Sequence, residues 1–447
     1  MKDFCNMALL TDLYQLTMVQ AYLGKGMEET AVFEFYVRNL PENRSFLIAQ
    51  GLESVVHYLE TLRFTEDDLA WLSNDSRFRK PLLDYLQSFR FSGDVQAMAE
   101  GTVFFANEPI LRVVAPLPQA QLVETRLVQL LQYPILVGTK AARIKQVAGD
   151  RLLVDFGLRR AHGAEAGLTA AKASYAAGFA GTSTIMAGSL YDIPLFGTVA
   201  HSFIQSFEYE EDAFQAFAQS QQDNIVFLID TYNVQTAVDT IIRLSPRLSE
   251  KQLKIKAVRI DSGDFEKICP IVRQKLDAAG LHDVGIFLSG NMDEYIIEAL
   301  VSKGVPVNGF GVGTKMITSS DAPYLECAYK LTEYQGIPKR KRSEGKASLP
   351  GRKQVIRYYT KEGLFDHDEI ALEHEFHRGH GLIQPVMIQG HRAKPLPSLN
   401  QIRDYIAEQL KSLPSNLLPL DSQTNYPVHV TDLLKEWTEK TDKGWIS

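Results

Sequence analysis

Between residues 150 and 315, short apolar segments alternate regularly with amphipathic segments of helix length. The apolar segments are rich in β-branched residues or bounded by glycine, and we predict strands near residues 151–157, 178–183, 195–200, 224–230, 256–261, 284–289 and 307–313. In most of the intervening segments, apolar residues recur every three or four positions, which is typical of helices. Continuous apolar strands that alternate with helices indicate a parallel sheet buried on both faces.

Seven strand–helix units favour a closed or nearly closed β/α barrel, and a doubly wound open sheet is the alternative. Residues 1–125 lack this rhythm: residues 30–41 alternate as a strand does, and later short strands are separated by Gly, Asn and Pro turns. We therefore predict an α+β N-terminal domain over 1–125 and the barrel with the active site over 126–330. We expect the C-terminal segment, 331–447, to pack partly against the N-terminal domain and to contain an amphipathic helix within 397–413.

Composition excludes several classes of protein. With 447 residues, of which 45% are hydrophobic and 23% charged, the chain can bury more than one sizeable core. A formal charge of −7 argues against a general nucleic-acid binder. Cys5, Cys269 and Cys327 are too far apart for a disulfide framework or a zinc motif, which favours a reducing compartment. Because the N-terminus resembles neither a signal peptide nor a membrane span, we expect a soluble, cytoplasmic protein.

Polar side chains gather just after the predicted strands, where barrel enzymes place reactive groups. In chain order they are Arg159, Arg160, Thr182, Ser183, His201, Asp230, Arg259, Asp261, Asp264, Ser289, Gly290, Asn291, Gly311, Gly313 and Thr314. A solvated surface pair is the alternative for Arg159 and Arg160, but packing alone does not explain such groups at seven successive strand ends. The residues thus predict an enzyme that acts on a phosphorylated substrate, without naming the reaction.

Structural alternatives exist for individual residues of this set. Asp264 suits the N-cap of a helix, whereas Asp261 suits a Mg²⁺-bound diphosphate or ribose hydroxyls. The glycines of 309–314 mark either a tight turn or a phosphate cradle, and His201 is either a structural or a catalytic histidine. We expect the basic loop 339–342 to be a solvated surface that could also attract anionic substrates.

Several segments occur in the order found in the nicotinate phosphoribosyltransferase family, which the chain closely resembles. They span roughly residues 9 to 357 and read LLTDLYQLTM, FEFYVRNLP, FLIAQGLE, DFGLRRAHG, GTSTIMAG, GTVAHSF, VRIDSGD, GFGVGT and LPGRKQVIR. The resemblance implies an irregular (β/α) barrel with an α+β N-terminal domain and a C-terminal extension. It also implies the reaction of nicotinate with 5-phosphoribosyl-1-diphosphate to give nicotinate mononucleotide and diphosphate, a step of NAD biosynthesis. ATP as co-substrate, Mg²⁺ and a homodimer with shared active sites are implied as well.

By motif match, His201 corresponds to the histidine that accepts phosphate from ATP. Arg259 is expected at the nicotinate carboxylate or the adjacent ring with Arg159 nearby, and Asp261 on the ribose or metal side. The remaining matches place Gly313 and Thr314 at the phosphates of the ribose donor and Thr198 and Tyr14 at the nicotinate pocket, with Tyr14 supplied by the neighbouring subunit.

Ser183 bears on the choice of acceptor. Related nicotinamide phosphoribosyltransferases carry an aspartate at this point of the motif, which accepts a hydrogen bond from an amide and repels a carboxylate. A serine donates to a carboxylate, so Ser183 favours nicotinate. The alternatives are nicotinamide as acceptor and a non-catalytic relative that binds phosphates or nucleotides. Quinolinate phosphoribosyltransferases are shorter and lack the matching histidine.

Overall fold

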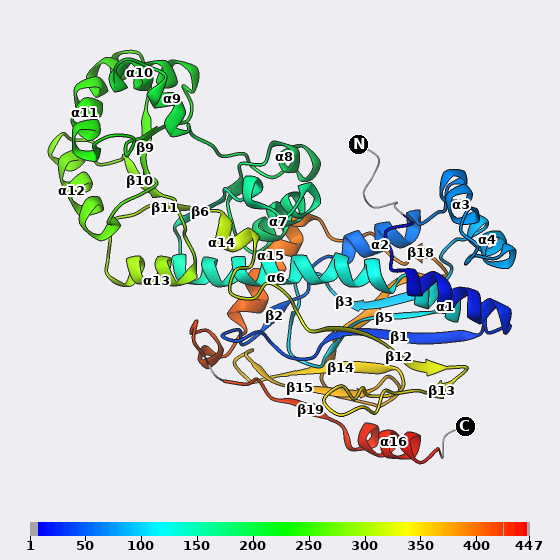
Figure 1. Cartoon of the computed structure of the whole chain (residues 1–447). Helices are drawn as coiled ribbons and strands as arrows, with labels where there is room; N and C mark the ends of the chain where they lie inside the picture. The colour runs from blue at the N-terminus through cyan, green and yellow to red at the C-terminus, as the bar shows by residue number, and fades with distance from the viewer. Residues whose placement is uncertain (1–7, 423, 445–447) are drawn as a thin grey trace. The chain divides into compact units, whose positions relative to one another are not determined.

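The computed structural model describes residues 8–422 and 424–444, so Cys5 lies outside the described residues. The chain forms two compact units, one made of residues 1–139 and 324–447 and the other of residues 140–323 (Figure 1). The first boundary falls inside the long helix α6 (Glu124–Ala148), whereas the sequence places the start of the barrel at residue 126. The second unit is therefore an insertion between two parts of the first.

The first unit is built on a seven-stranded antiparallel sheet with the order β13-β12-β1-β5-β3-β17-β18. Its strands are β1 (Thr30–Val37), β3 (Asp94–Met98), β5 (Pro109–Pro116), β12 (Cys327–Tyr334), β13 (Ile337–Pro338), β17 (Ile383–Ile388) and β18 (His391–Arg392). The predicted strand in residues 30–41 is thus confirmed as β1. Strand β12 pairs with β1, and β17 pairs with β3, so both ends of the chain contribute to one sheet.

A smaller sheet in the same unit has the order β16-β14-β15-β19. It contains β14 (Lys353–Tyr359), β15 (Phe365–Leu372), β16 (His380–Gly381) and β19 (Val428–Val430), while β2 (Leu47–Ile48) and β4 (Val103–Phe104) form a separate pair. The helices that begin in this unit are α1 (Leu13–Gly24), α2 (Leu52–Thr61), α3 (Glu66–Ser73), α4 (Lys80–Gln87), α5 (Leu117–Leu122), α6, α15 (Leu399–Lys411) and α16 (Asp432–Asp442).

Helix α15 confirms the amphipathic helix predicted within 397–413. Ser398 accepts a hydrogen bond from the backbone N–H of Gln401, whose side chain accepts one in return from the Ser398 backbone, a capping box that fixes where the helix begins. Ile402 and Ile406 are buried on one face of this helix, as the spacing requires.

The basic loop 339–342 is less free than the sequence suggests. Arg340 and Arg342 both form ion pairs with Asp442 near the end of α16, and the Arg340 side chain is only 13% exposed. The expectation of a solvated surface is therefore wrong for Arg340, because its partner lies about a hundred residues along the chain, beyond the reach of any local sequence pattern.

The second unit contains a six-stranded, wholly parallel sheet with the order β7-β6-β11-β10-β9-β8. Its strands are β6 (Leu152–Asp155), β7 (Gly181–Thr182), β8 (Ile225–Leu228), β9 (Ile255–Ile260), β10 (Gly285–Leu288) and β11 (Gly309–Val312). The helices between and after them are α7 (Ala164–Ala176), α8 (Ile185–Tyr191), α9 (His201–Gln205), α10 (Glu210–Ser220), α11 (Val234–Glu250), α12 (Phe265–Ala278), α13 (Glu294–Ser302) and α14 (Thr314–Ile317). The chain thus has an α/β fold whose parallel sheet curls into an irregular half-barrel (Figure 1).

One predicted strand does not form. Residues 195–200 join the sheet only through an isolated bridge between Thr182 and Leu195, and the described structure contains no strand over 196–200. The backbone N–H of Phe196 still donates to the Thr182 carbonyl. Pro194 has no N–H, so it cannot donate a hydrogen bond that would extend the pairing. Strands β7 and β8 consequently lie at opposite edges of the sheet, and the barrel is not closed.

Within the described residues, no helix is both long and apolar enough to cross a membrane.

A buried ion pair joins the strands of the smaller sheet. Arg357 on β14 donates three hydrogen bonds to Asp368 on β15, of 2.9 Å from Nε to Oδ1, 3.2 Å from Nε to Oδ2 and 2.6 Å from Nη2 to Oδ2, and neither side chain is exposed. The Tyr426 hydroxyl donates to the same carboxylate, and the Phe365 ring centroid lies 4.2 Å from the guanidinium carbon. These contacts compensate for removing two charges from water.

We predict that Asp368→Asn will destabilise the first unit by about 3–5 kcal/mol, because it removes the carboxylate that pairs directly with the buried Arg357 guanidinium. Urea unfolding followed by tryptophan fluorescence and circular dichroism measures the change. Asp432→Asn, at a side chain 94% exposed, is the control and should change stability little. Equal stability of the two variants would contradict the prediction.

Candidate active site

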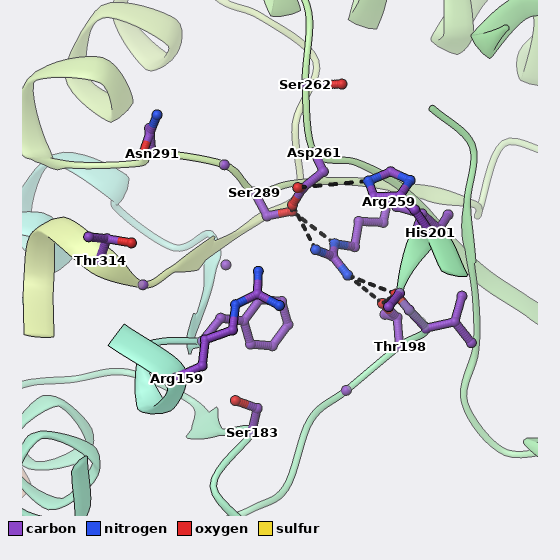
Figure 2. A pocket seen from close by; sticks show the side chains of 18 of the residues that line it. Arg159, Ser183, Thr198, His201, Arg259, Asp261, Ser262, Ser289, Asn291 and Thr314 are labelled. Atoms are coloured by element: carbon purple, nitrogen blue, oxygen red, sulfur yellow. Dashed lines mark hydrogen bonds and ion pairs between the residues drawn. The ribbon is translucent and has the colours of Figure 1, made fainter. Parts of the chain in front are cut away.

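The ends of the parallel strands in the second unit open onto a cavity of about 950 Å³. The eight residues to which the sequence assigns a role in this unit all line the cavity: Arg159, Ser183, Thr198, His201, Arg259, Asp261, Gly313 and Thr314. Thr182, Asp230 and Asp264, also predicted at strand ends, are absent from its lining. Most of the eight follow strand ends that are far apart in sequence but close together in the sheet, whereas Thr198 and His201 come from the segment that forms no strand (Figure 2). Tyr14 lies on α1 of the first unit, is 46% exposed and is absent from the lining of this cavity.

Arg259, near the end of β9, is the most highly connected of these side chains. Its guanidinium donates from Nε to Ser289 Oγ (2.8 Å), from Nη1 to Thr198 Oγ1 (2.8 Å) and to the Val199 carbonyl (3.2 Å), and from Nη2 to Asp261 Oδ1 (2.7 Å) (Figure 2). A guanidinium has five N–H donors, so one N–H, on Nη2, is left for a ligand. Arg259 is therefore held in place before any substrate arrives.

Asp261 immediately follows β9 and stays ionised within this network. Burial on its own raises the pKa of its carboxyl, but the hydrogen bond from Ser289 and the charge of Arg259 outweigh that and hold the pKa below its usual value. Asp261 Oδ1 accepts both bonds, and Asp261 Oδ2 accepts no hydrogen bond from the described part of the chain. The backbone N–H of Asp261 is fixed in turn by Asp230 Oδ2 at 2.9 Å.

His201 begins helix α9, directly after Ala200. Its Nδ1 lies 3.1 Å from the Thr231 hydroxyl, and its Nε2 lies 4.0 Å from Asp261 Oδ2. The side chain is 40% exposed and lines the cavity, so the structure does not bury it as a core histidine. The orientation presents Nε2 on the same side as the free oxygen of Asp261 (Figure 2).

Glycine at two positions lets the backbone approach the rim of the cavity. Gly290 has φ +91°, and a Cβ there would lie 2.0 Å from the carbonyl oxygen of Asp261. A Cβ on Gly313 would lie 3.0 Å from the Phe156 carbonyl oxygen. Thr314 follows Gly313 as the first residue of the short helix α14, so its backbone N–H is not used within that helix.

The sequence does not predict the roles of two residues of the site, Phe156 and Ser289. Phe156 lines the cavity, and the guanidinium carbon of Arg259 lies 5.4 Å from its ring centroid. Because Phe156 belongs to an apolar strand segment, the sequence alone does not distinguish it from a core residue. The place of Ser289 at a strand end predicts no particular partner, whereas in the structure its hydroxyl accepts a hydrogen bond from Arg259 and donates one to Asp261. Asp264, in contrast, caps α12 as expected.

Charge in the lining favours anions. Arg159, Arg160 and Arg259 contribute three positive charges, and among the described residues that line the cavity Asp261 is the one carboxylate. Within the described residues, Arg159 donates no hydrogen bond and forms no ion pair, so its donors are available. The cavity thus offers fixed and free guanidinium groups, hydroxyl donors and backbone N–H groups to an anionic ligand.

Three models of one family match the chain: the nicotinate phosphoribosyltransferase N-terminal domain over residues 9–132, the nicotinate phosphoribosyltransferase family over 152–347 and the nicotinate phosphoribosyltransferase C-terminal domain over 377–438. The chain belongs to the nicotinate phosphoribosyltransferase family. The C-terminal match extends beyond residue 357, where the motif resemblance ends.

Individual relatives agree with this assignment. The chain is 44% identical to a nicotinate phosphoribosyltransferase of Mycobacterium tuberculosis, over 95% of this chain and 92% of that protein. It is 34% identical to the nicotinate phosphoribosyltransferase of Bacillus subtilis, over 96% and 93% of the two chains. Its structure matches that of human nicotinic acid phosphoribosyltransferase with a TM-score of 0.86 and 28% identity, over 97% of this chain and 99% of that one.

We predict that Ser289→Ala will raise the pKa of Asp261, because it removes a hydrogen bond to the carboxylate and leaves burial less opposed. Because folding lowers the pKa of Asp261, this carboxylate stabilises the fold at pH values above its pKa in the unfolded chain. This stability is lost as the pH falls through its pKa in the folded protein. In the variant that loss should begin at higher pH. Carbon-13 NMR titration of the aspartate carboxyls measures the shift, with Ser302→Ala on α13 as the control. An Asp261 pKa equal to that of the unaltered protein would contradict the prediction.

Proposed function

We propose that the protein transfers a phosphoribosyl group from 5-phosphoribosyl-1-diphosphate to nicotinate, forming nicotinate mononucleotide and diphosphate for NAD biosynthesis, and that ATP drives the reaction. The observation that carries the proposal is the convergence of eight predicted site residues on one cavity. The family assignment and the names of the relatives support it.

The acceptor end of the cavity suits a pyridine carboxylic acid. The Phe156 ring offers a flat apolar surface to the pyridine, beside the fixed guanidinium of Arg259. The free N–H on Arg259 Nη2, the Arg159 guanidinium and the Ser183 hydroxyl are donors for the carboxylate. All three groups donate, so the site pairs with a carboxylate oxygen better than with an amide NH₂.

The donor end holds the ribose and its phosphates. Gly313 and Thr314 present backbone N–H groups and a hydroxyl to a phosphate. The pyridine nitrogen attacks the anomeric carbon, its bond to that carbon forms as the bond to the diphosphate oxygen breaks, and no proton has to leave. Positive charge that develops on the sugar is stabilised by the ionised Asp261.

His201 is the proposed site of phosphorylation by ATP. The Thr231 hydroxyl at Nδ1 fixes the ring, and Nε2 faces the cavity as the nucleophile. A bond forms from Nε2 to the terminal phosphorus of ATP, and the bond from that phosphorus to the bridging oxygen breaks to release ADP. Water later hydrolyses the phosphohistidine, which restores the imidazole.

Mg²⁺ fits this site as a metal held mainly by substrate. Among the described residues no group of three or more His, Cys, Asp or Glu side chains is placed to hold a metal ion. Asp261 Oδ2 is the free carboxylate oxygen in the cavity, and Mg²⁺ commonly binds one or two carboxylates together with substrate phosphates. When bound there, the ion would neutralise charge on the diphosphate leaving group.

A homodimer would complete the site. In the second unit, Ile185 and Leu190 on α8 and the nearby Leu195 are 75%, 57% and 52% exposed, close in sequence to Ser183. In the first unit, Leu13 and Tyr14 on α1 are 48% and 46% exposed. Exposed apolar side chains of this size indicate contact surfaces, and we propose that a second copy covers them and brings its Tyr14 to the cavity.

We predict that incubation with ATP will produce one acid-labile phosphate on His201, detectable by mass spectrometry at neutral pH. His201→Ala should lose this phosphate and ATP-stimulated turnover and retain only slow uncoupled transfer, whereas His282→Ala, at a side chain 70% exposed, should behave as the unaltered protein. Full ATP stimulation in His201→Ala would refute the phosphohistidine. Absence of transfer to nicotinate by the unaltered protein would refute the proposed function.

We predict that Arg259→Ala and Tyr14→Ala will each impair nicotinate turnover and that mixed dimers will recover part of it. Loss of Arg259 leaves Asp261 without its counter-charge and should cost on the order of 2–5 kcal/mol in transition-state binding. Random exchange of subunits gives about a quarter of the sites an intact set of residues if Tyr14 is shared across the interface. The kcat/KM of each variant and of the refolded mixture measures this. A mixture no more active than its components would contradict the shared site.

A further inference from the structure

Asp155, the last residue of β6, carries a fully buried carboxylate beside the cavity wall. Its Oδ1 accepts a hydrogen bond from the backbone N–H of Gly157 at 2.8 Å, and its Oδ2 accepts one from the Thr182 hydroxyl at 2.7 Å. Burial raises the pKa of Asp155, and both hydrogen bonds act against that rise. The side chain does not line the cavity, so it reaches a ligand only through other residues.

The first of these bonds fixes the turn that carries Arg159. Gly157 precedes the single 3₁₀ turn Leu158–Arg160, which the hydrogen bond from the Arg160 N–H to the Gly157 carbonyl closes at 2.8 Å. A Cβ at Gly157 would lie 2.9 Å from Asp155 Oδ1 and 2.9 Å from Ile317 Cβ. The turn therefore packs directly on the carboxylate, and a side chain at Gly157 would crowd it.

The second bond fixes the segment that carries Ser183. Thr182 Oγ1 accepts a hydrogen bond from the backbone N–H of Thr184 at 3.0 Å, and the N–H of Ser183 donates to the carbonyl oxygen of Asp155 at 2.9 Å. Because a carboxylate accepts and never donates, the Thr182 proton must point to Asp155 and its lone pair to Thr184. Ser183 is thus held from both sides while its own side chain stays exposed in the cavity.

We propose that Asp155 is a positioning residue that sets where Arg159 and Ser183 stand relative to each other, and thereby the selectivity of the site for a pyridine carboxylate over the corresponding amide. This inference rests on the proposed function. Arg159 and Ser183 follow neighbouring parallel strands, β6 and β7, and one carboxylate anchors both strand ends. Nothing in the contacts of Asp155 involves His201, whose ring is fixed by Thr231 and faces Asp261. Phosphorylation by ATP should therefore be independent of Asp155.

Two nearly isosteric variants test this. Asp155→Asn replaces one acceptor oxygen by an NH₂ donor, so the Gly157 N–H and the Thr182 hydroxyl no longer both find an acceptor. Thr182→Val removes the hydroxyl that links Asp155 to Thr184 and leaves the Gly157 bond intact. The ratio of kcat/KM for nicotinate to that for nicotinamide should fall about tenfold in each variant. The yield of phosphohistidine on His201 should stay unchanged.

The matched control is Thr240→Val on α11. Thr240 is also buried, but its hydroxyl donates to a backbone carbonyl of its own helix, so this variant should leave the ratio unchanged. If Asp155→Asn does not fold, Thr182→Val still decides the matter. A folded Thr182→Val that keeps the nicotinate-to-nicotinamide ratio of the unaltered protein overturns the inference. A variant that loses phosphohistidine in parallel with phosphoribosyl transfer also overturns it, because such a loss indicates general damage to the site. If the unaltered protein transfers to neither base, the proposed function itself fails and this inference falls with it.

Discussion

The guanidinium of Arg259 joins the ends of two neighbouring strands of the second unit to a segment that the sheet itself leaves apart. It links the end of β9 to Ser289 after β10 and to Thr198 and Val199, which belong to a segment without a strand partner. A closed barrel would hold that segment by a ladder of backbone hydrogen bonds. In this open sheet the side chain of Arg259 supplies bonds in its place, and His201 begins its helix two residues after Val199. The catalytic proposal depends on this attachment.

Holding a guanidinium so firmly has an electrostatic consequence. Four of its N–H groups are committed to protein acceptors, so Arg259 acts as a fixed charge with a single free donor and not as a flexible clamp. The same ion pair keeps Asp261 ionised, which leaves one carboxylate oxygen facing an otherwise positive cavity. A site of this kind can bind phosphates and a carboxylate and still offer negative charge to an electron-deficient sugar. Such preorganisation avoids reorientation of dipoles during the reaction.

Features set by residues close together in the sequence could be predicted from it, whereas contacts between distant segments could not. Strand–helix alternation and residues at strand ends are local, and a parallel sheet brings its strand ends together, so the sequence alone could place Arg159, Ser183, His201, Arg259, Asp261 and Thr314 in one region. The segment 195–200 is apolar enough for a strand, but it pairs with the sheet only through the bridge between Leu195 and Thr182. Pro194, directly before it, has no N–H to donate to a neighbouring strand. Phe156 has the sequence pattern of a core residue, although it lines the cavity. The pairing of Arg340 with Asp442 depends on how both ends of the first unit fold together.

The most direct test of the central claim, that Arg259 and its neighbours form one prearranged cavity for pyridine acid and ribose phosphate, is a crystal structure of the protein with nicotinate mononucleotide. It should place the pyridine ring against Phe156, the carboxylate near Ser183 and Arg159, and the phosphate at Gly313 and Thr314, with the Arg259 hydrogen bonds unchanged. A nucleotide bound outside this cavity, or one with its phosphate at Ser183 and its ring at Thr314, would contradict the account.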